Sequence, residues 1–131
     1  MRRAQEKLNR KEALALWHRV NLTGVLADAP DLTTRQLALL TTVYLEEGPH
    51  TVRSLAMRLN VTKAVITRAL NTLTRHGFID RGPDLRDKRS VLVKRTAGGS
   101  RYLAELSARI CRVSQTLDRP LDQKPSTVRV A

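Results

Sequence analysis

The stretch from Val61 to Gly77 has residue types and spacing suited to chemistry, because it combines basic, hydroxyl and amide side chains and contains no Asp or Glu. Its apolar residues recur at helical spacing and predict one buried stripe, made of Ile66, Ala69, Leu70 and Leu73. The opposite side carries groups that contact phosphates and base edges in DNA complexes. Those residues are Thr62, Lys63, Ala64, Thr67, Arg68, Asn71 and Arg75. A solvated helix normally mixes acids with bases, so the pattern favours a nucleic-acid surface.

A shorter predicted helix directly precedes this one. Thr51 is its expected N-cap, Leu55, Ala56 and Leu59 are its buried side, and Asn60 tolerates the left-handed conformation that ends a helix. Val61 fills the turn, and Thr62 caps the next helix. This order of helix, tight turn and helix predicts a helix-turn-helix, whose second helix enters the major groove of DNA. Thr51 and Arg53 then lie at the start of the first helix, where they join the candidate DNA-binding residues.

A predicted β-hairpin follows, with strands near residues 78–81 and 90–94 around a turn-rich loop. Its cations are Arg81, Arg86, Lys88 and Arg89. A basic hairpin beside a recognition helix is a wing, which lies against DNA backbone or in the minor groove, where a narrow groove attracts Arg. Asp87 is unexpected on such a surface; we predict that it orients a neighbouring Arg and caps the turn.

Helices are also predicted at both ends of the chain. The spacing of Leu14, Trp17, Asn21 and Val25 predicts a helix from about residue 4 to 26. Thr33 and Gln36 form a capping box that begins the next helix, which ends at Gly48-Pro49. Gly98-Gly99 is expected to be a junction. A last helix, from about residue 100 to 117, carries a heptad-like seam suited to packing on another helix. That seam is Leu103, Leu106, Ile110, Val113 and Leu117.

The net charge supports a polyanionic partner. The chain has 24 Lys and Arg against 12 Asp and Glu, a net charge of +12. Residues 50–96 alone contain 11 of these basic residues and 3 of the acidic ones, by count along the sequence. Bound phosphates release condensed counterions, so such a field favours DNA or RNA. Aromatic residues are only 3%, too few for a platform that stacks single strands.

Other classes are disfavoured by the composition. Cys111 is the one cysteine, so neither a disulfide framework nor a cysteine-rich zinc site is expected, and we interpret it as an inert structural thiol rather than an oxidant sensor. The three His are scattered, and His50 and His76 are expected to contact phosphate or solvent. No nucleophile has a base beside it, so we expect neither catalysis, nor a metal, nor a cofactor. The charged start of the chain indicates no signal peptide, and we expect a cytoplasmic, nucleoid-associated protein.

Residues 32–99 resemble the MarR family of winged-helix transcription regulators. The matching pieces are Leu32-Thr33-x-x-Gln36, Thr51-Val52-x-x-Leu55-Ala56-x-x-Leu59, Val61-Thr62-x-x-x-Ile66-Thr67-Arg68, Leu73-x-x-x-Gly77-Phe78-Ile79-x-Arg81, Asp84-x-x-Asp87-Lys88-Arg89-Ser90 and Thr96-x-x-Gly99. The resemblance implies a homodimer on a pseudo-palindromic operator, with Arg89 at the wing tip and Asp87 supporting it. Two departures are Arg95, where the family usually has Leu, and the single convincing helix after Gly99, where the family commonly has two.

The expected fold class is therefore mainly α with a small β-hairpin wing. Residues 1–30 and 98–118 are expected to form dimerisation helices, residues 31–97 the winged helix-turn-helix, and residues 119–131 a mobile tail. The favoured function is a sequence-specific double-stranded DNA-binding regulator, a repressor. The alternative is a non-specific architectural nucleoid protein, and a third reading is a protein-interaction module. A small-molecule effector is possible but has no support in the sequence.

Overall fold

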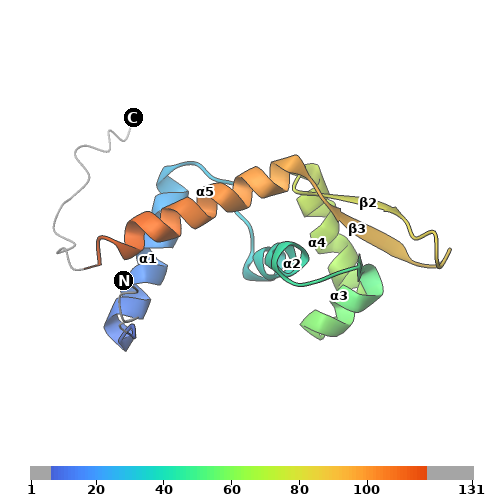
Figure 1. The fold of residues 1–131 in the computed structure, drawn as a ribbon, viewed down its shortest axis with the longest axis horizontal. Helices are drawn as coiled ribbons and strands as arrows, with labels where there is room; N and C mark the ends of the chain where they lie inside the picture. Colours follow the sequence, from blue (N-terminus) through green and yellow to red (C-terminus); the bar gives the residue numbers. More distant parts are fainter. Residues whose placement is uncertain (1–6, 118–131) are drawn as a thin grey trace, which may run out of the picture. The chain divides into compact units, whose positions relative to one another are not determined.

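The computed structural model describes residues 7–117 and is mainly helical with a small sheet. The elements are α1 (Arg10–Leu26), α2 (Thr34–Leu45), β1 (His50–Thr51), α3 (Val52–Leu59), α4 (Lys63–Arg75), β2 (Ile79–Pro83), β3 (Val91–Arg95) and α5 (Ala97–Ser114) (Figure 1). The fold class predicted from the sequence is confirmed. The chain divides into two compact units, Pro30–Glu105 and a unit whose described residues are 7–29 and 106–117. The predicted tail at 119–131 lies outside the described residues.

Side-chain caps begin the helices of the Pro30–Glu105 unit where the sequence predicted them. The Gln36 amide donates to Thr33 Oγ1 at 3.1 Å and the Gln36 side chain accepts from the Thr33 amide at 2.9 Å, so the predicted capping box is present. Thr51 caps α3 by accepting from the Ser54 amide at 3.0 Å, and Thr62 caps α4 by accepting from the Val65 amide at 3.3 Å. Each cap satisfies a backbone donor that the first helical turn leaves unpaired.

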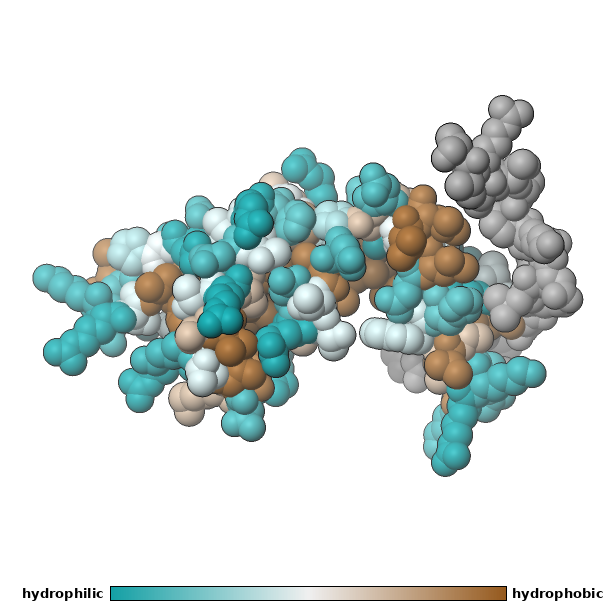
Figure 2. Space-filling view, turned by 180° about the vertical axis from the view of Figure 1, so that it is seen from behind, coloured by the Kyte–Doolittle hydropathy of each residue, from teal (hydrophilic) through white to brown (hydrophobic). Residues whose placement is uncertain are grey.

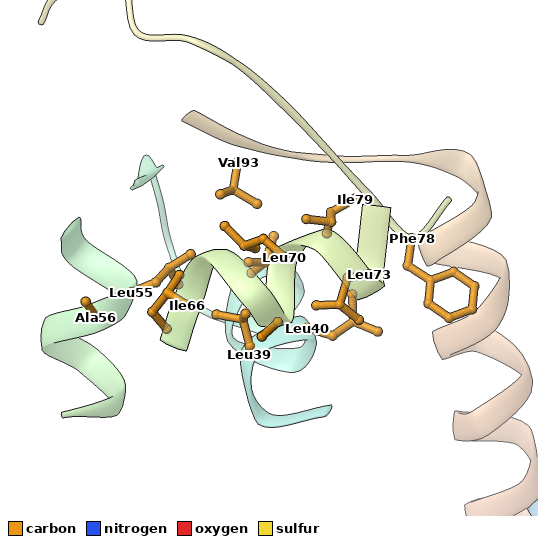
Figure 3. Close-up of a cluster of buried hydrophobic side chains, with 12 residues drawn as sticks. Leu39, Leu40, Leu55, Ala56, Ile66, Leu70, Leu73, Phe78, Ile79 and Val93 are labelled. Carbon is orange, nitrogen blue, oxygen red and sulfur yellow. The ribbon is translucent and has the colours of Figure 1, made fainter. Parts of the chain in front are cut away.

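One apolar core holds this unit together (Figure 3). Leu39 and Leu40 from α2 and Leu55 from α3 meet the buried stripe of α4, and Ile79 and Val93 cover it from the sheet. The stripe of α4 is buried as predicted, with Ile66, Leu70 and Leu73 fully inaccessible. Burial of each such side chain stabilises the fold by about 1.5–3 kcal/mol.

A glycine ends α4 and turns the chain into the sheet. Gly77 has φ +75°, the Phe78 amide donates to the Leu73 carbonyl at 3.0 Å, and the Gly77 amide donates to the Thr74 carbonyl at 2.9 Å. This pattern is a Schellman motif, in which a residue without Cβ takes the left-handed conformation at lowest cost. The predicted C-terminal role of Gly77 is therefore present.

The sheet contains one strand more than the predicted hairpin. Its order is β1-β3-β2, all antiparallel, and β1 pairs His50 with Val93 and Thr51 with Leu92. Two residues are too few to show the alternation by which a strand is recognised in sequence. In the hairpin, β2 extends to Pro83 rather than ending near Arg81.

The predicted junction at Gly98-Gly99 is wrong, because α5 already begins at Ala97 and contains both glycines. Close packing explains why glycine is needed within a helical turn. A Cβ on Gly98 would lie 2.7 Å from the Gly77 carbonyl oxygen, and a Cβ on Gly99 would overlap the Tyr44 hydroxyl and the Phe78 carbonyl oxygen. The glycines allow α5 to approach the turn after α4.

Arg95 and His50 bind the carbonyl groups at the end of α2. Arg95 Nε donates to the Val43 carbonyl at 2.8 Å, and His50 Nε2 lies 3.0 Å from the Glu46 carbonyl oxygen. A cation at a helix C-terminus opposes the negative end of the helix dipole. Arg95, which departs from the family pattern, therefore has a local structural role. The expectation that His50 contacts phosphate or solvent is wrong for its Nε2 atom.

In the second unit, α1 begins at Arg10, after the N-cap Asn9, rather than near residue 4. Residues 7–9 are described and are not helical, and the earlier ones lie outside the described residues. Arg19 donates to the Thr116 carbonyl at 2.6 Å, which ties α1 to the chain just after α5. The helix α5 ends at Ser114, so the predicted helix end at Leu117 is slightly late.

Gly99→Ala is expected to destabilise the domain, because its Cβ would overlap Tyr44 and Phe78. Overpacking of this kind costs about 1–3 kcal/mol. Thermal unfolding followed by circular dichroism measures the loss. Gly24→Ala is the matched control, since its Cβ would meet only the end of the Arg109 side chain at 4.0 Å; this change is expected to stabilise helix α1 by about 0.5–1 kcal/mol. Equal unfolding midpoints for Gly99→Ala and wild type would contradict the packing described.

Candidate nucleic-acid interface

Helix α4 presents a polar face to solvent because its opposite face is locked into the core. Every α4 residue selected from the sequence is exposed, together with its N-cap. The exposed set is Thr62, Lys63, Ala64, Thr67, Arg68, Asn71 and Arg75. The structure therefore brings the candidate reading residues together on one surface, and that surface carries no carboxylate. The positive end of the helix dipole lies at the same end as Lys63 and favours phosphate.

The two candidate residues of α3 differ in how free they are. Arg53 is exposed in the first turn of α3. Thr51 is half-buried, and its hydroxyl oxygen accepts the Ser54 amide. Thr51 therefore serves chiefly to start α3, while Arg53 offers a cation without a printed partner among the described residues.

The wing tip consists of two successive Asp-x-Arg turns. The Arg86 amide donates to Asp84 Oδ1 at 2.9 Å, and the Arg89 amide donates to Asp87 Oδ1 at 3.0 Å. The Asp84 amide also donates to the Ser90 carbonyl at 3.3 Å, which closes the loop. Short side-chain turns of this kind hold a loop without regular structure. Arg86, Asp87, Lys88 and Arg89 are all exposed at this tip, and Figure 2 shows long hydrophilic side chains projecting from it.

Asp87 caps the turn as predicted, but it orients Arg89 through the backbone and not through the guanidinium. In residues 7–117 the one ion pair joins Arg58 and Glu46, with Arg58 Nη2 2.5 Å from Glu46 Oε1. The hydrogen bond from Arg58 lowers the pKa of Glu46 below its usual range. The carboxylate nearest to α3 is thus paired with a residue outside the candidate set, and the wing cations stay unneutralised.

One contact at the interface could not be found from the sequence. Arg81 Nη1 donates to Asn71 Oδ1 at 2.8 Å, which links β2 to the exposed face of α4. Both residues were selected separately as DNA-binding candidates. No periodicity relates a strand residue to a helix residue ten positions earlier, so only the folded structure shows them as a pair.

A shallow depression of about 250 Å³ lies beside α4. It is lined by Thr33, Arg35, Gln36, Val65, Arg68, Ala69 and Thr72. Arg35, in the first turn of α2, was not selected from the sequence, because its helix as a whole lacks a basic face. The depression places Arg35 on the same surface as Arg68 and adds a cation to it.

Other kinds of site have little support in the described part of the chain. No group of three or more His, Cys, Asp or Glu that could hold a metal ion occurs among residues 7–117. Cys111 is exposed on α5. His76 stacks on Phe78 with ring centroids 5.3 Å apart. Within the described residues, no helix is long and apolar enough to cross a membrane.

The helix-turn-helix of α3 and α4, followed by the basic hairpin of β2 and β3, defines a winged-helix domain. Residues 32–91 match the model of the MarR family. The chain therefore carries a MarR-family domain, and the resemblance seen in the motifs is confirmed.

Two curated relatives come from Bacillus subtilis. The uncharacterized HTH-type transcriptional regulator YdgG is 32% identical over 93 residues, which are 70% of this chain and 61% of YdgG. The HTH-type transcriptional repressor YetL is 35% identical over 71 residues, or 53% of this chain and 42% of YetL. The chain thus spans less than two thirds of the length of each of these relatives.

Solved structures show the same fold. A mutant of S. aureus MepR bound to an oligodeoxyribonucleotide matches with a TM-score of 0.71 at 21% identity, over 87% of this chain and 81% of MepR. A mutant MarR from E. coli complexed with operator DNA matches with a TM-score of 0.60 at 26% identity, over 82% of this chain and 71% of MarR. Both likenesses extend beyond the winged helix-turn-helix into the flanking helices.

Asp87→Ala is expected to loosen the wing tip, because the Arg89 amide loses its acceptor. Loss of one such hydrogen bond costs about 0.5–1.5 kcal/mol locally. Amide hydrogen exchange should become faster at Arg89 and Ser90 and remain unchanged in α4. Asp87→Asn, which keeps an acceptor oxygen, should largely restore protection. Unaltered exchange at Arg89 in Asp87→Ala would show that the turn holds without this carboxylate.

Proposed function

We propose that this protein is a sequence-specific double-stranded DNA-binding transcription regulator and acts as a repressor. The observation that carries the proposal is the exposed face of α4, which is free of carboxylates from Val61 to Gly77 and lies opposite a fully buried stripe. Its cations, hydroxyls and amide are the groups that read phosphates and base edges. The protein acts by binding and not by catalysis, in keeping with the regulators that it resembles.

The proposed mechanism divides the work between α4 and the wing. Helix α4 enters the major groove with Lys63 leading and Thr67 and Arg68 facing base edges. The wing places Arg86, Lys88 and Arg89 against backbone or the minor groove, where narrow A·T-rich segments attract guanidinium groups. Arg53 in α3 adds a backbone contact. The repressor YetL and the DNA-bound MepR and MarR structures support this arrangement.

We infer that the protein is a homodimer assembled through α1 and the second half of α5. Leu14, Trp17 and Val25 form an apolar stripe on α1, yet they are 70%, 62% and 76% exposed in the single chain. Figure 2 shows apolar side chains at the surface of this part of the chain. A second copy would bury them. Two recognition helices would then read half-sites about 34–36 Å apart along the duplex.

The net charge of +12 favours a second candidate, a non-specific architectural protein of the nucleoid. A competition titration against bulk genomic DNA separates the two functions. A sequence-specific regulator favours its own site by about a thousandfold or more. Equal affinity for every duplex would assign the architectural role. Either function would place the protein with the DNA of the cell, in the cytoplasm.

Arg68→Ala is expected to relax sequence preference and weaken binding to the preferred duplex by about 1–3 kcal/mol, because a bidentate base contact is lost. The measurement is fluorescence anisotropy with the selected duplex and with versions changed at single positions. The proposal fails if wild type and Arg68→Ala bind the selected and a random duplex equally well.

Arg89→Ala is expected to weaken binding to all duplexes by a similar factor, because a backbone contact does not depend on sequence. The slope of log affinity against log salt should flatten by about one per site. Titrations between about 50 and 200 mM salt provide the slope. An unchanged slope with altered base preference would assign Arg89 to direct base reading instead.

Trp17→Glu is expected to weaken dimer formation by more than about 2 kcal/mol, since it removes a large apolar anchor and buries a charge. Sedimentation velocity over a range of concentrations measures the change. Arg101→Glu, an exposed substitution on α5 in the Pro30–Glu105 unit, is the control and should leave assembly unaltered. A wild-type protein that stays monomeric at every concentration would contradict the homodimer.

A further inference from the structure

The contact between Asn71 and Arg81 changes what the interface can read. Arg81 Nη1 donates to Asn71 Oδ1 at 2.8 Å. A guanidinium only donates hydrogen bonds, so it must face the oxygen of the amide and not its nitrogen. Asn71 is exposed in the third turn of α4, on the same outward side as Arg68 and one turn after it.

The strand β2 holds Arg81 in this position. Its residue pairs with Val93 across the sheet, and its amide donates to Asp80 Oδ1 at 2.8 Å. The Arg81 side chain is half-buried, unlike those of Arg68 and Arg75, which are exposed and make no printed contact within residues 7–117. A charge-assisted hydrogen bond from a fixed donor is about twice as strong as a neutral one. The Asn71 amide is therefore oriented before any ligand arrives.

The amide group that remains for a ligand is a donor. Asn71 Nδ2 makes no printed hydrogen bond within the described residues, so its two N–H groups face outward beside the remaining N–H groups of Arg81. Together the pair offers hydrogen-bond donors and a positive charge, and no free acceptor without competition from the guanidinium.

We propose that Asn71, positioned by Arg81, reads a guanine in the major groove and disfavours adenine at that position; this inference rests on the proposed DNA-reading function. Asparagine recognises adenine by accepting from N6 and donating to N7 at once. Here Arg81 occupies the acceptor and places a cation near the N6 amino group. Guanine presents O6 and N7, two acceptors, and so matches a surface of donors. Cytosine presents an amino donor and is disfavoured for the same reason as adenine.

Arg81 is thus a positioning residue for base specificity. The proposal is tested by selecting duplexes from a randomised pool with wild-type protein and with variants. Wild type should enrich a guanine at one position of each half-site. Arg81→Leu frees Asn71 Oδ1, and the preference at that position should change from guanine to adenine by about tenfold, within the range for one base contact. Arg81→Lys keeps a donor and should retain the guanine.

Asn71→Asp provides a test that does not depend on the stability of the Arg81 variants. It keeps an acceptor for Arg81, so the unfolding temperature should not fall, but it removes both N–H donors. Affinity for the guanine-containing duplex should fall about tenfold relative to the adenine version. Arg86→Leu removes a wing cation that has no contact with α4, and it should weaken binding to all duplexes without changing the preferred base.

The outcomes distinguish this inference from the function on which it rests. Failure of wild type to enrich any sequence from the pool would overturn the proposed sequence-specific function. Enrichment by wild type, with the same base preferred at every position by Arg81→Leu or by Asn71→Asp, would overturn the role of the pair and leave the regulator function standing.

Discussion

Burial of the apolar stripe of α4 is the constraint on which the rest of the structure depends. Ile66, Leu70 and Leu73 are inaccessible because α2, α3 and the sheet enclose them. Each contributes about 1.5–3 kcal/mol, so rotation of the helix about its axis would expose several of them together and cost far more than any polar contact could return. The outward direction of Lys63, Thr67, Arg68 and Asn71 is thus a consequence of core packing and not of their own interactions. A reading surface built in this way is rigid before it binds.

The few carboxylates near the interface are engaged elsewhere, which leaves its cations free. Glu46 pairs with Arg58, and Asp84 and Asp87 accept backbone amides in the wing. A carboxylate that accepts a hydrogen bond from an amide keeps its charge, yet it faces its own loop and shapes it. The acidic residues thus build the wing without forming ion pairs with its arginines. This explains how aspartates are compatible with a surface that binds a polyanion.

Local signals in the sequence predicted most of the elements that position the interface. The caps at Thr33, Thr51 and Thr62 and the left-handed residues Asn60 and Gly77 lie where expected, because each acts within a few residues of its own backbone. The errors have a different origin. The glycines at 98 and 99 were interpreted by their flexibility, whereas their small size matters, since the partners they admit lie more than 20 positions away in sequence. The short strand β1 exists through its pairing with β3.

The sequence by itself determined the helix-turn-helix, the basic wing and the family, since these follow from periodicity, capping residues and charge along the chain. Only the tertiary structure decided which groups act together: Arg95 and His50 at the end of α2, and Arg81 with Asn71 at the DNA-reading face. These pairs join residues of different elements, and a hydrogen bond across elements depends on directions in space. Sequence periodicity carries no record of those directions, because it reports each helix or strand about its own axis alone.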